Sequence, residues 1–287
     1  MRTVPFTLLS TVAATAALTA ACGGSSKPDT VGNRGDAARA PALVYIGWGV
    51  DSVFEVDCYD PSGSCDAIRA QAVAGGELAS GDGRFKLIGP RKEECGASGD
   101  VADVIGYQRV AGPEDSAVGI AAFPVDAAID LVRTPRSWGE DEPVRPSVSD
   151  DLRARVAARA TADLAGSDRA RTITAGELVV DQVLEGNLTG GPKVDLLIAA
   201  NLPLPDADGP GYVWSGLVLI PDGDLAAATT LWQSDLETFW IDAHYDLDGD
   251  GRREFVFTAA YYEGTTMGAA AVVDGKLVFG ATVSCGA

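Results

Sequence analysis

Two stretches of this chain, 59 residues apart, share one pattern, and that pattern limits the fold more than any other feature. The stretches are 187–200 (N-L-T-G-G-P-K-V-D, then L-L-I-A-A) and 246–260 (D-L-D-G-D-G-R-R-E, then F-V-F-T-A-A). A second apolar segment follows in each copy, at 216–220 and 268–273, with a glycine at its start and an Asp-Gly pair after it. Short apolar runs bounded by turn residues predict β-strands. We therefore expect an internal duplication of about 60 residues, built from strand–loop–strand units.

The second loop, residues 246–254, has the composition of a calcium site. Calcium takes six to eight oxygen ligands, which carboxylates and backbone carbonyls supply. Gly249 and Gly251 permit the positive φ angles that a chain needs to wrap around an ion. The predicted ligands are the carboxylates of Asp246, Asp248, Asp250 and Glu254 and the backbone carbonyl of Arg252. The alternative is a solvated acidic turn, in which the crowded carboxylates would repel one another.

The loop departs from an EF-hand, because position 12 counted from Asp246 is Phe257 and the flanking residues are aromatic and β-branched. A strand–loop–strand unit with these acids resembles the FG-GAP or VCBS-type repeat of integrin-like β-propellers. The resemblance covers roughly residues 175–287, and it implies a calcium ion bound between the strands of a propeller blade. The chain departs from that family in showing two copies, whereas a closed propeller has at least about four blades.

The first loop has lost most of its acids. Asn187, Thr189 and Gly191 stand where the second loop has aspartates, and Asp195 remains. We expect this copy to keep the fold without the ion.

An amphipathic helix is predicted before the repeats, at about residues 150–165. Apolar residues recur at every fourth position, and Ser147 or Ser149 is the expected N-cap before Asp150. Gly166 is the expected end of the helix. The predicted fold is thus mainly β, with antiparallel sheets, two degenerate propeller-blade-like repeats in the C-terminal half and one helix before them. The helix and repeats occupy 147–287; the region 42–146 is expected to be mainly β but of unknown type.

The N-terminus is typical of an exported lipoprotein. Residues 1–21 form a short apolar segment after Arg2, which predicts a signal peptide. The following Cys22 resembles the lipidated cysteine of a lipobox, although Thr19 stands where leucine is usual. The resemblance implies a diacylated, palmitate-bearing anchor in a membrane, and Gly23 implies the outer membrane. The alternative is a plain secretory signal cleaved near Ala20 or Ala21. Residues 22–41, rich in Gly, Ser and Pro, are the expected lipidated tether.

Four further cysteines remain if Cys22 carries lipid. An exported protein meets oxidising conditions, so two disulfides are expected, and three connectivities are open. In one of them, Cys58 pairs with Cys65 across a turn-forming stretch, and a bond between Cys95 and Cys285 then ties the two ends of the body together. The four residues are Cys58, Cys65, Cys95 and Cys285.

Composition narrows the function without fixing it. The formal net charge of −19 argues against nucleic-acid binding, because such a surface repels phosphates. A single histidine, His244, excludes multi-histidine metal centres, and G-x-S-x-G, S-x-x-K and Walker A motifs are absent from the sequence. We therefore favour an acidic, calcium-stabilised module in binding, adhesion or envelope structure, with a protein or carbohydrate ligand left open. The alternative is an envelope hydrolase with an unrecognised site in the N-terminal half. The aromatics Trp214, Trp232, Trp240, Tyr261 and Tyr262 could line a ligand groove or fill the core.

Overall fold

The computed structural model describes residues 42–48, 52–59, 76–80, 83–95, 100–113, 123–124, 129, 132–133, 145–204, 211–261 and 264–286. The chain divides into two compact units, Met1–Asp36 and Ala37–Ala287, and every described residue belongs to the second. The predicted signal peptide, the predicted lipid anchor Cys22 and the predicted tether at 22–41 lie outside the described residues.

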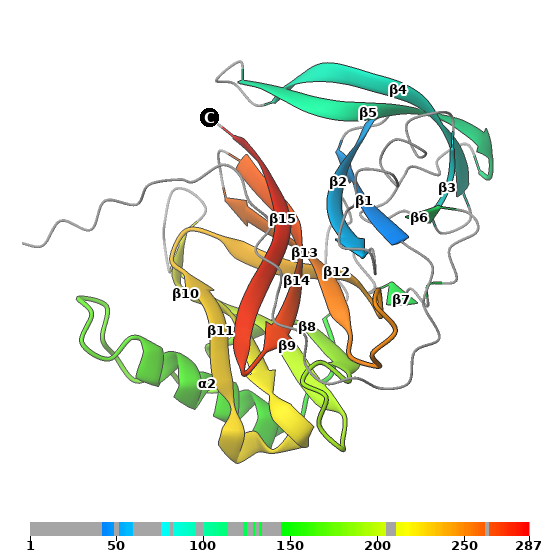
Figure 1. Ribbon diagram of the computed structural model, residues 1–287. Helices are drawn as coiled ribbons and strands as arrows, with labels where there is room; N and C mark the ends of the chain where they lie inside the picture. The colour runs from blue at the N-terminus through cyan, green and yellow to red at the C-terminus, as the bar shows by residue number, and fades with distance from the viewer. Residues whose placement is uncertain are drawn as a thin grey trace, which may run out of the picture. The chain divides into compact units, whose positions relative to one another are not determined.

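Antiparallel sheets dominate the described parts of the chain (Figure 1). The first sheet has the order β1-β2-β5-β4-β3-β6. Its strands are β1 (Ala42–Trp48), β2 (Ser52–Tyr59), β3 (Glu77–Ser80), β4 (Gly83–Cys95), β5 (Asp100–Ala111) and β6 (Phe123–Pro124). In β4 the residues alternate between buried, such as Phe85 and Leu87, and exposed, such as Arg84 and Lys86, which is why this sequence forms a half-buried strand.

Two further sheets are built from consecutive strands in the C-terminal half, together with one short strand from earlier in the chain. The second sheet has the order β11-β10-β9-β8 and the third the order β15-β14-β13-β12-β7. The second contains β8 (Val179–Gly186), β9 (Asp195–Pro203), β10 (Tyr212–Ile220) and β11 (Thr229–Ser234), with short 3₁₀ turns η1 (Pro221–Gly223) and η2 (Leu225–Ala227) before β11. The third contains β12 (Thr238–Tyr245), β13 (Glu254–Tyr261), β14 (Gly264–Val273), β15 (Lys276–Gly286) and the short β7 (Val132–Arg133). The prediction of a mainly β protein with antiparallel sheets is confirmed.

One helix, α2 (Asp150–Asp163), precedes the second sheet, as predicted. Its N-cap is Ser149, whose Oγ accepts a hydrogen bond from the backbone N–H of Leu152 at 3.2 Å. Asp150 and Asp151 lie in the first turn, where the helix dipole favours negative charge. Gly166 follows with a φ of 89°, a conformation that favours glycine after a helix end. In the described part of the chain, no helix combines the length and apolar character needed to cross a membrane.

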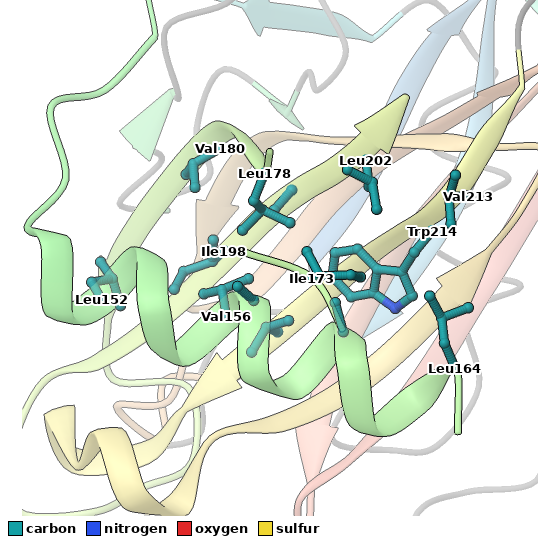
Figure 2. Packing of buried hydrophobic residues seen from close by; sticks show 14 of the residues in the cluster. Leu152, Val156, Leu164, Ile173, Leu178, Val180, Ile198, Leu202, Val213 and Trp214 are labelled. Atoms are coloured by element: carbon teal, nitrogen blue, oxygen red, sulfur yellow. The ribbon is translucent and has the colours of Figure 1, made fainter. Parts of the chain in front are cut away.

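The second sheet is buried on both faces. Figure 2 shows α2 packed against one face, with Leu152 and Val156 pointing toward Ile198 and other apolar side chains of the sheet. Successive residues of β9 point to opposite faces, so Leu197 and Ala199 join a different hydrophobic cluster, which they share with the third sheet. That cluster receives Phe239, Ile241, Phe255, Phe257 and Ala259 from β12 and β13. The second sheet therefore lies between α2 and the third sheet.

Candidate metal centre

The acidic loop connects two strands of the third sheet. β12 and β13 pair in antiparallel register, with His244 opposite Phe255 and Tyr245 opposite Glu254. Tyr245, Leu247 and Phe255 are buried, so both ends of the loop are anchored in the core. The two strands and the loop between them form the predicted strand–loop–strand unit, and the loop carries the predicted ligand residues.

Three of the predicted ligands converge. Carboxylate oxygens of Asp246, Asp248 and Asp250 all lie within 4.8 Å of one another. Oxygens bound to one calcium ion at about 2.3–2.6 Å lie at most about 5 Å apart, so this spacing fits a shared calcium ion. Glu254 does not belong to this group of three. The role of the Arg252 carbonyl as a ligand stays a prediction.

The carboxylates also shape the loop through the backbone. Asp246 accepts hydrogen bonds from the N–H groups of Gly249 at 2.6 Å and Gly251 at 3.2 Å, and Asp248 accepts one from Asp250 at 3.0 Å. Gly249 and Gly251 have φ angles of 75° and 85°, which L-residues with a side chain rarely adopt. The two glycines thus let the chain curl so that alternate side chains point to one place.

Arg252 places a cation of the chain itself against these carboxylates. The Arg252 side chain donates to Asp250 at 2.6 Å, and the Asp250 carboxylate also accepts the Arg252 backbone N–H at 2.7 Å. The hydrogen bond to Asp250 raises the pKa of the Arg252 guanidinium. Burial raises the pKa of Asp248, and the neighbouring charges of Asp250 and Asp246 raise it further. The two neighbouring carboxylates thus disfavour the charged form of Asp248, a cost that a bound cation would remove.

Glu254 lies at the base of the loop in a different environment. Its Oε2 accepts a hydrogen bond from the backbone N–H of Leu247 at 2.9 Å. Burial raises its pKa from 4.5 to about 8, and the charges of Asp248 and Asp57 add to the shift. Asp57, from β2, also accepts a hydrogen bond from the hydroxyl of Tyr245 at 3.1 Å. No local sequence signal links Asp57 to Tyr245, 188 residues away, so sequence reasoning missed it.

The first loop repeats the hydrogen bonds of the second at the same 59-residue offset. Gly190 donates to Asn187 Oδ1 at 2.9 Å, as Gly249 does to Asp246, and Gly190 has a φ of 81°. Leu188 donates to the Asp195 carboxylate at 2.7 Å, as Leu247 does to Glu254.

A third hydrogen bond follows the same offset. Gly191 donates to Thr189 Oγ1 at 3.3 Å, as Asp250 does to Asp248. Side chains at equivalent positions therefore accept hydrogen bonds from equivalent backbone N–H groups in the two loops, although the first loop has few charged residues.

Asp195 organises the first loop through hydrogen bonds from the backbone. Its side chain is fully buried and accepts backbone N–H groups from Leu188, Thr189 and Asp222, each at 2.7 Å. The hydroxyl of Thr189 also contacts both carboxylate oxygens, at 3.1 and 3.0 Å. The carboxyl oxygens thus have protein donors as partners, as a buried polar group requires.

The two loops are joined to each other. The Asn187 side-chain amide donates to the carbonyl of Gly251 at 2.7 Å, and the Asn187 backbone carbonyl accepts the N–H of Arg253 at 2.7 Å. A Cβ added at Gly190 would lie 3.0 Å from Arg252 Cδ, which shows how closely the loops approach. The sequence presented Asn187 as a lost ligand and gave no signal of this contact.

The predicted cysteine sites are only partly within the described residues. Cys58 lies in β2 and is disulfide-bonded. Cys95 lies in β4 and Cys285 in β15, and Cys65 lies outside the described residues. The connectivity stays a prediction.

His244 lines an open cleft of about 480 Å³ between β7, β8, β12 and the start of α2. Ser147, Ser149 and Glu185 line the same cleft, so a serine and the histidine share one hollow. Ser149 caps α2, which gives its hydroxyl a structural role. The cleft therefore does not by itself assign a hydrolase.

The aromatic residues serve packing where their surroundings are described. Trp214 is buried beneath α2, and its Nε1 donates to Asp163 at 3.3 Å (Figure 2). Trp232 packs against Phe239, with ring centroids 4.6 Å apart, and against Phe279 at 5.2 Å. Tyr262 lies outside the described residues. These contacts favour the core interpretation for the two tryptophans.

Comparison of the chain with protein-family models, with curated proteins and with solved structures found no match.

Proposed function

We propose that this chain is an exported lipoprotein whose β module is stabilised by one calcium ion in the loop 246–254. The observation that carries the proposal is the convergence of the Asp246, Asp248 and Asp250 carboxylates between two buried strands. Glu254 completes the acidic set at the base of the loop, as the resemblance to FG-GAP or VCBS-type repeats implies. The ion would offset the mutual repulsion of these carboxylates and so favour the folded loop.

The same proposal includes the fold. We take the second and third sheets as two degenerate propeller-blade-like repeats. The shared hydrogen bonds of the two loops support this, as does the matching strand order β8–β9–β10–β11 and β12–β13–β14–β15. Helix α2 covers the face of the second sheet on which a preceding blade would pack. The second sheet would therefore be the first of the two blades.

The role of the module is binding or structure in the cell envelope. The net charge of −19 disfavours nucleic acids and suits a divalent cation or a basic partner. A lipid on Cys22 would hold the protein at the membrane. Gly23 after that cysteine implies the outer membrane by the same lipoprotein resemblance, and the proposed ligand is a protein or a carbohydrate.

Thermal unfolding tests the calcium site. For a dissociation constant of roughly 0.1–1 mM, 10 mM calcium adds about 1.4–2.7 kcal/mol to the folded state. For a domain of this size that raises Tm by about 3–10 °C. Asp248→Asn, which keeps the shape and removes the charge, should abolish the increase. An equal increase in both proteins would assign the effect to the acidic surface as a whole.

Labelling with radioactive palmitate tests the anchor. The wild type should take up label and partition into detergent, and Cys22→Ser should do neither. Labelling of the serine variant would show that the acyl chain is elsewhere.

A further inference from the structure

The strongest unexplained feature is the bridge between the two loops, which neither the acidic composition nor the duplication requires. The loop 187–195 is held rigidly by Asp195, whose buried carboxylate binds three backbone N–H groups, one of them from Asp222 of the turn before β11. Asp222 in turn accepts the N–H of Lys193 at 2.9 Å. The first loop is thus cross-linked to its own sheet independently of any ion.

From this rigid loop, Asn187 reaches the acidic loop with both its side chain and its backbone. The side-chain amide holds the Gly251 carbonyl, and the backbone carbonyl holds the Arg253 N–H, both at 2.7 Å. These two points flank Arg252, the residue whose carbonyl is the predicted backbone ligand. The Oδ1 of the same side chain accepts the Gly190 N–H, which fixes the orientation of the amide.

We infer that Asn187 is a positioning residue for the acidic loop: it fixes the 251–253 segment from the neighbouring loop, so that the segment is preorganised before a cation arrives. The part of the inference that concerns cation affinity rests on the proposed calcium site. Its structural part, the restraint of the acidic loop, does not depend on any cation. Preorganisation of this kind lowers the ordering cost of binding.

Two substitutions separate the bridge from the turn of the first loop. Asn187→Ala removes both side-chain hydrogen bonds. Asn187→Asp keeps an acceptor for the Gly190 N–H but places a carboxylate oxygen against the Gly251 carbonyl, so it breaks the bridge alone. Leu152→Ala, in the contact between α2 and the second sheet, is the control for a general loss of stability.

The first readout is hydrogen exchange of the peptide amides at 247–253, measured on the purified protein with a chelator present. Both Asn187 variants should exchange faster than the wild type by on the order of fivefold, the factor expected for one ordinary net hydrogen bond. Leu152→Ala should lower Tm without a local change in this loop. Unchanged exchange in both Asn187 variants would overturn the inference, and acceleration in Asn187→Ala alone would assign the effect to the first loop.

The second readout is calcium titration of the wild type and Asn187→Ala. The variant should bind calcium with a dissociation constant raised by about fivefold. Equal constants would refute the effect on affinity. If the wild type binds no calcium, the proposed function fails, while the exchange measurement still decides whether Asn187 restrains the loop.

Discussion

Glu254 makes the stability of the calcium-free protein depend on pH in an unusual direction. Its pKa is raised from 4.5 to about 8, mainly by burial. An acid whose pKa is raised on folding stabilises the folded state fully below the pKa of the unfolded chain, and that contribution is lost as the pH rises through the folded value. We therefore expect the calcium-free protein to lose stability from pH 5 to pH 8.

The size of the loss follows from the linkage between proton binding and folding. A shift from 4.5 to about 8 corresponds to a free energy of unfolding that falls by about 3–4 kcal/mol between pH 5 and pH 8. Glu254→Gln keeps the size of the side chain and an acceptor for the Leu247 N–H but cannot ionise. In that variant this part of the pH dependence should disappear.

Urea unfolding followed by tryptophan fluorescence, in chelator at several pH values, measures the effect. All other titrating groups contribute to both proteins, so the difference between the two pH profiles isolates Glu254. The profiles should diverge by about 3–4 kcal/mol, with the variant the more stable at pH 8. Parallel profiles would refute the assignment of a raised pKa to this carboxyl.

Two further perturbations test the packing around the site. The buried side chain of Gln182 in β8 donates to the Ile241 carbonyl at 3.0 Å and accepts its N–H at 2.7 Å. Gln182→Leu should therefore cost about 2–4 kcal/mol in urea unfolding, and a cost under about 1 kcal/mol would show that this clamp is dispensable. Burial raises the pKa of Asp181 from 3.8 to about 6, against the opposing effects of Arg145 and Asn201. The Asp181 carboxyl thus stabilises the folded state below the pKa of the unfolded chain, and this contribution is lost as the pH rises through about 6. Asp181→Asn should therefore raise the free energy of unfolding by about 2–3 kcal/mol at pH 7 and by little at pH 4. Equal effects of the substitution at both pH values would contradict this.

Local patterns predicted the elements of this fold well. The period of four in Leu152, Val156 and Ala160, together with a serine cap and a glycine stop, was enough to place α2, because each signal acts within a few residues. The strand after the acidic loop was equally clear, since Phe255 and Phe257 with their neighbours form a short apolar run.

Features that depend on contacts between distant segments were beyond the sequence. The interpretation of Asn187 as a degraded ligand could not anticipate its bond to Gly251, 64 residues away, because an asparagine in a loop has many equivalent partners. The sequence also could not anticipate the role of Asp57, which lies in the first sheet and interacts with Glu254 and Tyr245 of the third sheet. The sequence also grouped Glu254 with the three aspartates; the structure brings the three aspartates together and shows the charge of Asp248 acting on Glu254, whose role as a ligand stays a prediction.

Direct calcium titration tests the central claim most simply. Isothermal titration calorimetry of the wild type should show one calcium site per chain, with a dissociation constant of roughly 0.1–1 mM. Asp248→Asn should show no saturable heat in the same range, because one of the three converging carboxylates has lost its charge. If the wild type shows no saturable heat up to 10 mM calcium, or if the variant binds as the wild type does, the loop 246–254 is an acidic turn and the proposed function is wrong.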